Sequence, residues 1–153
     1  MTQTGALADL YQEVILDHNR RPRNYGALPD PSSFAHGHNP LCGDKLTVYL
    51  HTDGAMVTGV RFEGSGCAIS KASASLMTEA VTGKSVDDAI ALFDRFQAAV
   101  TTPPGEPVDT EPLGKLAVLI GVRGFPMRVK CASLAWHTLK SAIVRSSEIA
   151  RTE

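Results

Sequence analysis

The 153-residue sequence predicts a small α+β fold, in which an antiparallel hairpin or three-stranded sheet is covered by about five helices. The first observation is that the alternation typical of half-buried strands is confined to the first half of the chain, up to about residue 63. The second is that helical periodicity dominates after residue 67. Strands that come early and helices that come late exclude a doubly wound α/β fold, in which the two alternate. A chain of this length supports one core, so we expect a single domain over residues 1–153.

The composition is that of an ordinary globular protein and restricts the partners that we expect. Hydrophobic residues make up 43% and charged residues 20% of the chain, and the formal net charge is -1, which argues against nucleic acid as a partner. The longest uninterrupted apolar stretch, residues 116–122, is too short to cross a membrane, and the first ten residues do not resemble a secretory signal. Three cysteines are a poor disulfide framework, so we expect reduced thiols and a cytoplasmic location.

The first predicted element is a helix that ends before Pro22, because a proline disfavours the helical conformation in the residue that precedes it. Its apolar residues recur every three or four positions and form one stripe: Leu7, Leu10, Tyr11, Val14 and Ile15. His18 continues this stripe, so we interpret it as a packed, hydrogen-bonded histidine rather than as a metal ligand. The polar, proline-containing loop that follows could include a short edge strand over residues 34–38.

A β-hairpin is predicted over about residues 45–63. Apolar and polar residues alternate from Leu46 to His51, and the strand pattern resumes over Met56–Glu63. The Asp53-Gly54 pair between the two strands is a type I′ turn signal. The loop that carries the first cysteine therefore leads into the hairpin, and the second cysteine follows it directly.

The remaining elements are predicted to be helices. The first begins at Cys67 and can end at Gly83, and Ser85 can cap the start of the second. Four prolines make residues 101–112 a loop. A short helix is expected over residues 113–120, and a final helix from about Arg128 to Ala150.

Three cysteines and one aspartate, from three separate segments, suit a tetrahedral metal site. They are Cys42, Asp44, Cys67 and Cys131. In an antiparallel hairpin the start of one strand lies beside the end of the next, so Cys42, Asp44 and Cys67 should share one edge of the sheet. Cys67 should also lie at a helix N-terminus, where the helix dipole favours the thiolate. Cys131, near the start of the last helix, would have to be brought to this edge by packing.

Other interpretations of the cysteines stay open on the residue pattern alone. Free cysteines are often buried and inert, as small hydrophobic residues. A purely structural zinc site normally uses paired cysteines such as C-x-x-C, which this sequence lacks, and an aspartate in place of a fourth thiolate favours a more exchangeable metal. Arg128 and Lys130 flank Cys131, where they could lower its pKa or simply be surface charges.

Two longer strings are far more specific than three isolated cysteines. They are the N-P-x-C-G-D string at residues 39–44 and the G-x-G-C-x-I-S string at residues 64–70. With these strings the sequence resembles the U-type iron–sulfur cluster assembly family, over about residues 10–143. The resemblance implies a fold like that of SufE and NifU, and a metal held by Cys42, Asp44, Cys67 and Cys131.

Within this family the sequence is more similar to the zinc-binding SufU branch than to the IscU scaffold branch. Lys130 stands where the scaffold branch has a histidine, the chaperone-binding L-P-P-V-K motif is absent, and the segment between Cys67 and Cys131 is long. The resemblance implies a zinc-dependent sulfurtransferase, which accepts persulfide sulfur from a SufS-type cysteine desulfurase and passes it to a SufBCD-like scaffold or another acceptor. We expect Cys42 to be the sulfur acceptor, because its glycine-flanked loop should be the most mobile of the three segments.

Two alternatives belong to different functional classes. In the first, the same four side chains hold a nascent [2Fe–2S] cluster, and the chain is a scaffold that builds and transfers it. In the second, the chain is an interaction module whose zinc is only structural. Metal content separates the first alternative from the zinc-dependent sulfurtransferase.

Overall fold

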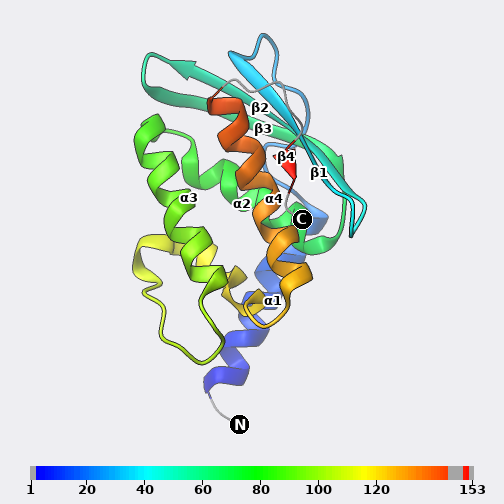
Figure 1. Ribbon diagram of the computed structural model, residues 1–153, viewed down its shortest axis with the longest axis vertical. Helices are drawn as coiled ribbons and strands as arrows, with labels where there is room; N and C mark the ends of the chain where they lie inside the picture. The colour runs from blue at the N-terminus through cyan, green and yellow to red at the C-terminus, as the bar shows by residue number, and fades with distance from the viewer. Residues whose placement is uncertain (1–2, 145–149, 152–153) are drawn as a thin grey trace.

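The computed structural model describes residues 3–144 and 150–151, and it confirms the predicted α+β fold (Figure 1). The helices are α1 (Gln3–Arg20), α2 (Ala68–Val81), α3 (Val86–Thr101), the 3-10 helix η1 (Glu111–Val122) and α4 (Pro126–Ile143). The strands are β1 (Ser33–Asn39), β2 (Asp44–Asp53), β3 (Met56–Ser65) and β4 (Ala150–Arg151). None of the helices within the described residues combines the length and the apolar character needed to span a bilayer.

The sheet has the strand order β3-β2-β1-β4, and its first three strands are antiparallel. The short strand predicted over residues 34–38 is β1, which pairs with β2 on one side and with the two-residue β4, in parallel, on the other. Along β2, Leu46, Val48 and Leu50 are buried, while the alternate side chains face outward. Helices α2 and α4 cover the buried face, so the sheet is solvated on one side only (Figure 1).

The hairpin between β2 and β3 differs from the prediction in its turn type. Two residues, Gly54 and Ala55, connect the strands, and Asp53 pairs with Met56. Gly54 has a φ of 61°, but Ala55 is not among the residues with positive φ. A type I′ turn requires positive φ at both central residues, whereas a type II′ turn requires it only at the first, which glycine supplies here.

Helix α4 is held against the sheet by a close approach to β1. A Cβ atom at Gly37 would lie 2.0 Å from Oγ1 of Thr138, so only a glycine allows this spacing. On its other side α4 places Trp136, which is fully buried, against Phe96 at a ring-centroid distance of 5.2 Å. This packing fixes the position of Cys131, which lies on the same helix.

Two predicted helices differ from those observed. The final helix ends at Ile143 rather than at Ala150, which instead forms β4 and pairs with Gly37; residues 145–149 lie outside the described part of the chain. The helix predicted over residues 113–120 is the longer 3-10 helix η1, which is interrupted at Gly114 by a φ of 55°.

Candidate metal centre

Three of the four predicted ligands, Cys42, Asp44 and Cys131, form one group at an edge of the sheet, and Cys67 lies beside it. Cys42 lies in the turn between β1 and β2, Asp44 begins β2, Cys67 caps α2 and Cys131 lies in α4. One ligand atom from each of Cys42, Asp44 and Cys131 lies within 4.8 Å of the others. Sγ of Cys67 is 3.8 Å from Oδ2 of Asp44. The strand pairing explains most of this convergence, since the start of β2 lies beside the end of β3 in the observed register.

Asp44 is fully buried, and its carboxylate has one partner that fixes its orientation. The backbone N–H of Cys67 donates a hydrogen bond to Oδ1 at 2.9 Å. Among the side chains of residues 11–144, no lysine, arginine or histidine forms a salt bridge with this carboxylate. A buried carboxylate without a counter-ion is costly, so its environment fits a bound cation.

Cys67 is the N-cap of α2, as the sequence predicts. Its Sγ accepts a hydrogen bond from the backbone N–H of Ser70 at 3.4 Å, the position that a capping oxygen usually occupies. The residue before it, Gly66, lies so close to Asp44 that an added Cβ would be 2.7 Å from Oδ1. The corner between β3 and α2 therefore depends on a glycine to bring the Cys67 backbone against the carboxylate.

Cys42 lies in an exposed turn that is organised by Asn39. The backbone N–H groups of Cys42 and Gly43 both donate to the Asn39 carbonyl, at 3.3 and 2.8 Å, and the side-chain Oδ1 of Asn39 accepts the Leu41 N–H at 3.2 Å. Gly43 has a φ of 74°, which glycine adopts at no steric cost. Cys42 is exposed, whereas the Asn39 side chain beneath it is fully buried.

Cys131 is the buried thiol of the cluster. Its Sγ lies 3.2 Å from Sγ of Cys42 and 3.9 Å from Nδ2 of Asn39. Burial raises the pKa of the Cys131 thiol, and the adjacent Cys42, Asp44 and Cys67 raise it further. A divalent cation would relieve this crowding of electron-rich atoms. Three sulfurs and one carboxylate oxygen are a donor set that suits zinc.

Sequence reasoning missed Asn39 as part of this cluster, although it belongs to the N-P-x-C-G-D string. The two flanking cations do not join the cluster: the Arg128 guanidinium lies over the Phe125 ring at 4.5 Å, and in the described part of the chain neither Arg128 nor Lys130 forms a salt bridge. His18 is packed and hydrogen-bonded as predicted, with Nδ1 2.7 Å from Oγ of Ser75.

Comparisons with known proteins show what the whole chain is similar to. A family model described as the NifU-like N terminal domain matches residues 10–132. The chain is 39% identical over 145 residues to the zinc-dependent sulfurtransferase SufU of Bacillus subtilis, covering 95% of this chain and 97% of that protein. It is 43% identical over 141 residues to the iron-sulfur cluster assembly scaffold protein IscU of Streptococcus pyogenes, covering 92% and 87%. The crystal structure of a protein from Fervidobacterium islandicum, described as an iron-sulfur cluster assembly scaffold protein for the SUF system (FiSufU), superposes with a TM-score of 0.79 at 34% identity, covering 86% of this chain and 94% of that one.

Proposed function

The chain belongs to the family of NifU-like N-terminal domains, and from that premise we propose that it serves iron–sulfur cluster assembly by carrying sulfur. In this proposal it accepts persulfide sulfur from a cysteine desulfurase of the SufS type and passes it to a SufBCD-like scaffold or another acceptor. The relative named as a zinc-dependent sulfurtransferase supports the proposal, because its similarity extends over nearly the whole of both chains.

The residues proposed to hold a zinc ion are Cys42, Asp44, Cys67 and Cys131. Bound zinc would keep the thiols as thiolates without oxidising them, because the ion has no redox chemistry of its own. Asp44 offers Oδ2 to the cluster while Oδ1 is held by the Cys67 backbone, so the carboxylate is already oriented. An oxygen ligand among three sulfurs makes the set more exchangeable than one of four thiolates, which suits a working site.

The observation that carries the proposal is the contrast in exposure between Cys42 and Cys131. A sulfur acceptor must be reached by a partner, and Cys42 is exposed whereas Cys131 is buried. Cys67 is exposed too, but its Sγ accepts the Ser70 N–H as a helix cap. We therefore assign Cys42 as the sulfur acceptor. Its position in an exposed turn also suits this role, because a partner can reach it there.

In the proposed reaction the Cys42 thiolate attacks the outer sulfur of the persulfide on the desulfurase. A sulfur–sulfur bond forms to Cys42, the sulfur–sulfur bond within the donor persulfide breaks, and the donor cysteine leaves as a thiolate. The exchange is redox-neutral and needs no external electrons. It requires reduced thiols, so we place it in the cytoplasm.

A second function is favoured by the relatives named as IscU scaffold proteins, one of which is 43% identical to this chain. The same three thiols and one carboxylate are chemically adequate to hold a [2Fe–2S] cluster while it is built and transferred. The two functions predict different metals in the purified protein: zinc for the sulfurtransferase, iron with acid-labile sulfide for the scaffold.

Metal analysis combined with a desulfurase assay tests the proposal. We expect about one zinc per chain, stimulation of desulfurase turnover by the wild type, and labelled sulfur on Cys42. Asp44→Ala should lose zinc and alter the stimulation, and Cys42→Ser should no longer accept the label. The exposed His51→Gln, at the other end of β2, is the matched control and should behave as the wild type.

Three results would contradict the proposal in different ways. Iron and acid-labile sulfide without stimulation would support the scaffold. Zinc without stimulation, together with unfolding of Cys42→Ser, would indicate a structural site. No metal at all would indicate that the three cysteines are inert side chains without a shared site.

A further inference from the structure

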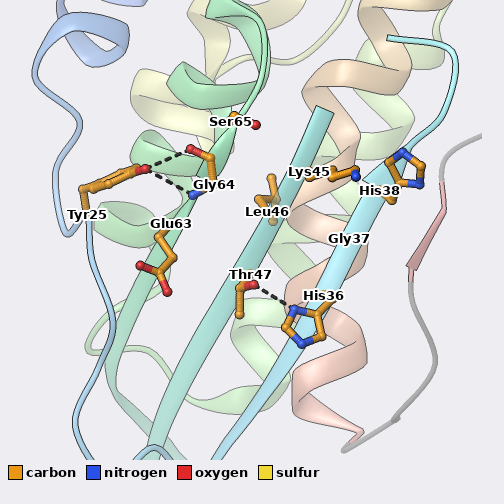
Figure 2. A pocket seen from close by; sticks show the side chains of 10 residues that line it. All are labelled: Tyr25, His36, Gly37, His38, Lys45, Leu46, Thr47, Glu63, Gly64 and Ser65. Atoms are coloured by element: carbon orange, nitrogen blue, oxygen red, sulfur yellow. Dashed lines mark hydrogen bonds between the residues drawn. The ribbon is translucent and has the colours of Figure 1, made fainter. Parts of the chain in front are cut away.

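Tyr25 contacts the corner between β3 and α2, although it lies in the loop after α1. Its hydroxyl donates a hydrogen bond to the Gly64 carbonyl at 2.8 Å, and the Gly64 N–H donates back to the hydroxyl at 3.2 Å (Figure 2). A phenol can donate and accept at once, so one side chain satisfies both backbone groups of Gly64. We propose that Tyr25 is a positioning residue: it holds in place the segment from Gly64 to Cys67, which carries the Cys67 ligand of the metal centre.

The aromatic ring of Tyr25 strengthens this contact on both sides of the corner. Phe62, on β3, meets the ring edge-on at a centroid distance of 5.2 Å and an interplanar angle of 83°. Lys71, in the first turns of α2, places its Nζ 5.9 Å from the ring centroid. The side chain thus touches the strand before Cys67 and the helix after it.

The backbone around Tyr25 is itself fixed to the sheet. The Phe62 N–H donates to the Asn24 carbonyl at 3.1 Å, and the Gly26 N–H donates to the Phe62 carbonyl at 2.8 Å. Asn24 adopts a φ of 57°, which turns the chain so that it can run beside β3. Tyr25 is therefore presented to the corner from a defined position, even though 44% of its surface is exposed.

The corner needs an external hold because two of its residues are glycines. Glycine has more conformational freedom than any other residue type, and the segment from Gly64 to Cys67 is exposed. Yet the Cys67 N–H must stay within hydrogen-bond distance of Asp44 for the two ligands to meet. The hydrogen bonds of Tyr25 to Gly64 restrain the start of this segment and leave the Cys42 turn untouched.

The inference rests on the proposed metal site. Its test is designed so that a failure of the positioning role of Tyr25 can be told apart from a failure of the metal site itself. The test variant is Tyr25→Phe, which removes only the hydroxyl. The matched control is Tyr49→Phe, which removes a hydroxyl on β2 that donates to the Glu63 side chain instead of to a backbone group. Zinc affinity is measured by competition with a chromophoric chelator, and the visible spectrum of the cobalt-substituted protein reports ligand geometry.

We expect Tyr25→Phe to bind zinc about three- to tenfold more weakly, because the variant loses both hydrogen bonds to Gly64, and to show a changed cobalt spectrum. Tyr49→Phe should match the wild type in both. Unchanged affinity and spectrum in Tyr25→Phe, or an equal loss in Tyr49→Phe, would overturn the inference.

Amide hydrogen exchange in the metal-free protein tests the hold without any metal. In the wild type, the Gly64 amide should be protected from exchange although the residue is exposed, and Tyr25→Phe should speed its exchange about three- to tenfold. An unprotected Gly64 amide in the wild type would overturn the inference even if the variant did not fold. A wild type that binds no zinc or cobalt would contradict the proposed function, while the exchange data would still decide whether Tyr25 holds the corner.

Discussion

The backbone N–H of Cys67 lies 2.9 Å from Oδ1 of Asp44, so one proposed ligand is oriented by the main chain of another. The two residues come from different elements, the start of β2 and the cap of α2. Because Oδ1 is occupied, Oδ2 is the oxygen that faces the Cys67 sulfur, at 3.8 Å. This relationship makes the carboxylate the most informative group to change.

Asp44→Asn should weaken zinc binding but should not destabilise the metal-free protein. The amide keeps an oxygen that can accept the Cys67 N–H, and it removes a buried charge that has no ion-pair partner in the described part of the chain. We expect the metal-free variant to be as stable as the wild type or more stable, by about 1 kcal/mol, and its zinc affinity to fall about tenfold or more. Urea unfolding with and without a chelator measures both. Asp53→Asn, at an exposed carboxylate, is the control; a less stable metal-free Asp44→Asn would show that the charge supports the fold.

Gly66→Ala should disrupt the metal centre more than the fold. The new Cβ would lie 2.7 Å from Oδ1 of Asp44, so the carboxylate would have to move away from Cys67. Gly121→Ala is the control, because a Cβ there meets no atom within 4 Å. We expect loss of zinc binding only in Gly66→Ala, measured by metal content after dialysis. Normal metal content in Gly66→Ala would mean that the segment between β3 and α2 can shift to accommodate the new Cβ.

Gly37→Ala should destabilise the protein through the contact between β1 and α4. Its Cβ would lie 2.0 Å from Oγ1 of Thr138, and overpacking of this kind costs about 1–3 kcal/mol. The double variant Gly37→Ala/Thr138→Ala removes the clashing oxygen and should regain part of the loss. Denaturant unfolding of the two single variants and the double variant measures the coupling. Purely additive effects would argue against the contact.

The stability of the metal-free protein should fall as the solution is made acidic, in part because of His18. Burial lowers the pKa of His18 below its ordinary value of 6.5, and the nearby Arg23 charge lowers it further. The unfolded chain then binds a proton more readily than the folded one, so stability is full above pH 6.5 and declines as the pH falls below it. The imidazole lies in a closely packed site: its Nδ1 is 2.7 Å from Oγ of Ser75, and that oxygen also accepts the Arg23 backbone N–H.

The test compares unfolding free energies of the metal-free protein at pH 7.5 and pH 5.5. His18→Gln should show a smaller difference between the two values than the wild type, whereas His36→Gln, at an exposed position, should not change it. Burial also lowers the pKa of His137, so some pH dependence should remain in His18→Gln. An undiminished difference in His18→Gln would contradict the role of the buried imidazole.

The local parts of the fold were predictable because short-range patterns determine them. The hairpin predicted over about residues 45–63 is Asp44–Ser65. Helices begin after Cys67 and after Ser85, as predicted, and both side chains accept backbone N–H groups of their helices. The end of the last helix was predicted wrongly, at Ala150 instead of Ile143. Helical periodicity indicates where a helix can bury one face, but it does not indicate where the chain pairs with a strand instead. Ala150 pairs with Gly37 of β1.

The candidate site was predictable in its residues but not in its assembly. The meeting of Asp44 and Cys67 follows from strand pairing, which the sequence pattern indicates. The arrival of Cys131 depends on the packing of α4 against Gly37, a contact between segments distant in the chain. The contact of Tyr25 with Gly64 could not be predicted from the sequence, because an exposed tyrosine in a loop belongs to no periodic pattern.

The 3.2 Å approach of the Cys42 and Cys131 sulfurs joins positions that are 89 residues apart in the chain. A zinc ion bound to both would close a loop that contains most of the protein, and it would restrict the unfolded chain far more than the folded one. The full ligand set would also be missing from any growing chain that had not yet exposed α4. Metal loading would then have to follow the synthesis of α4 and its packing against the sheet.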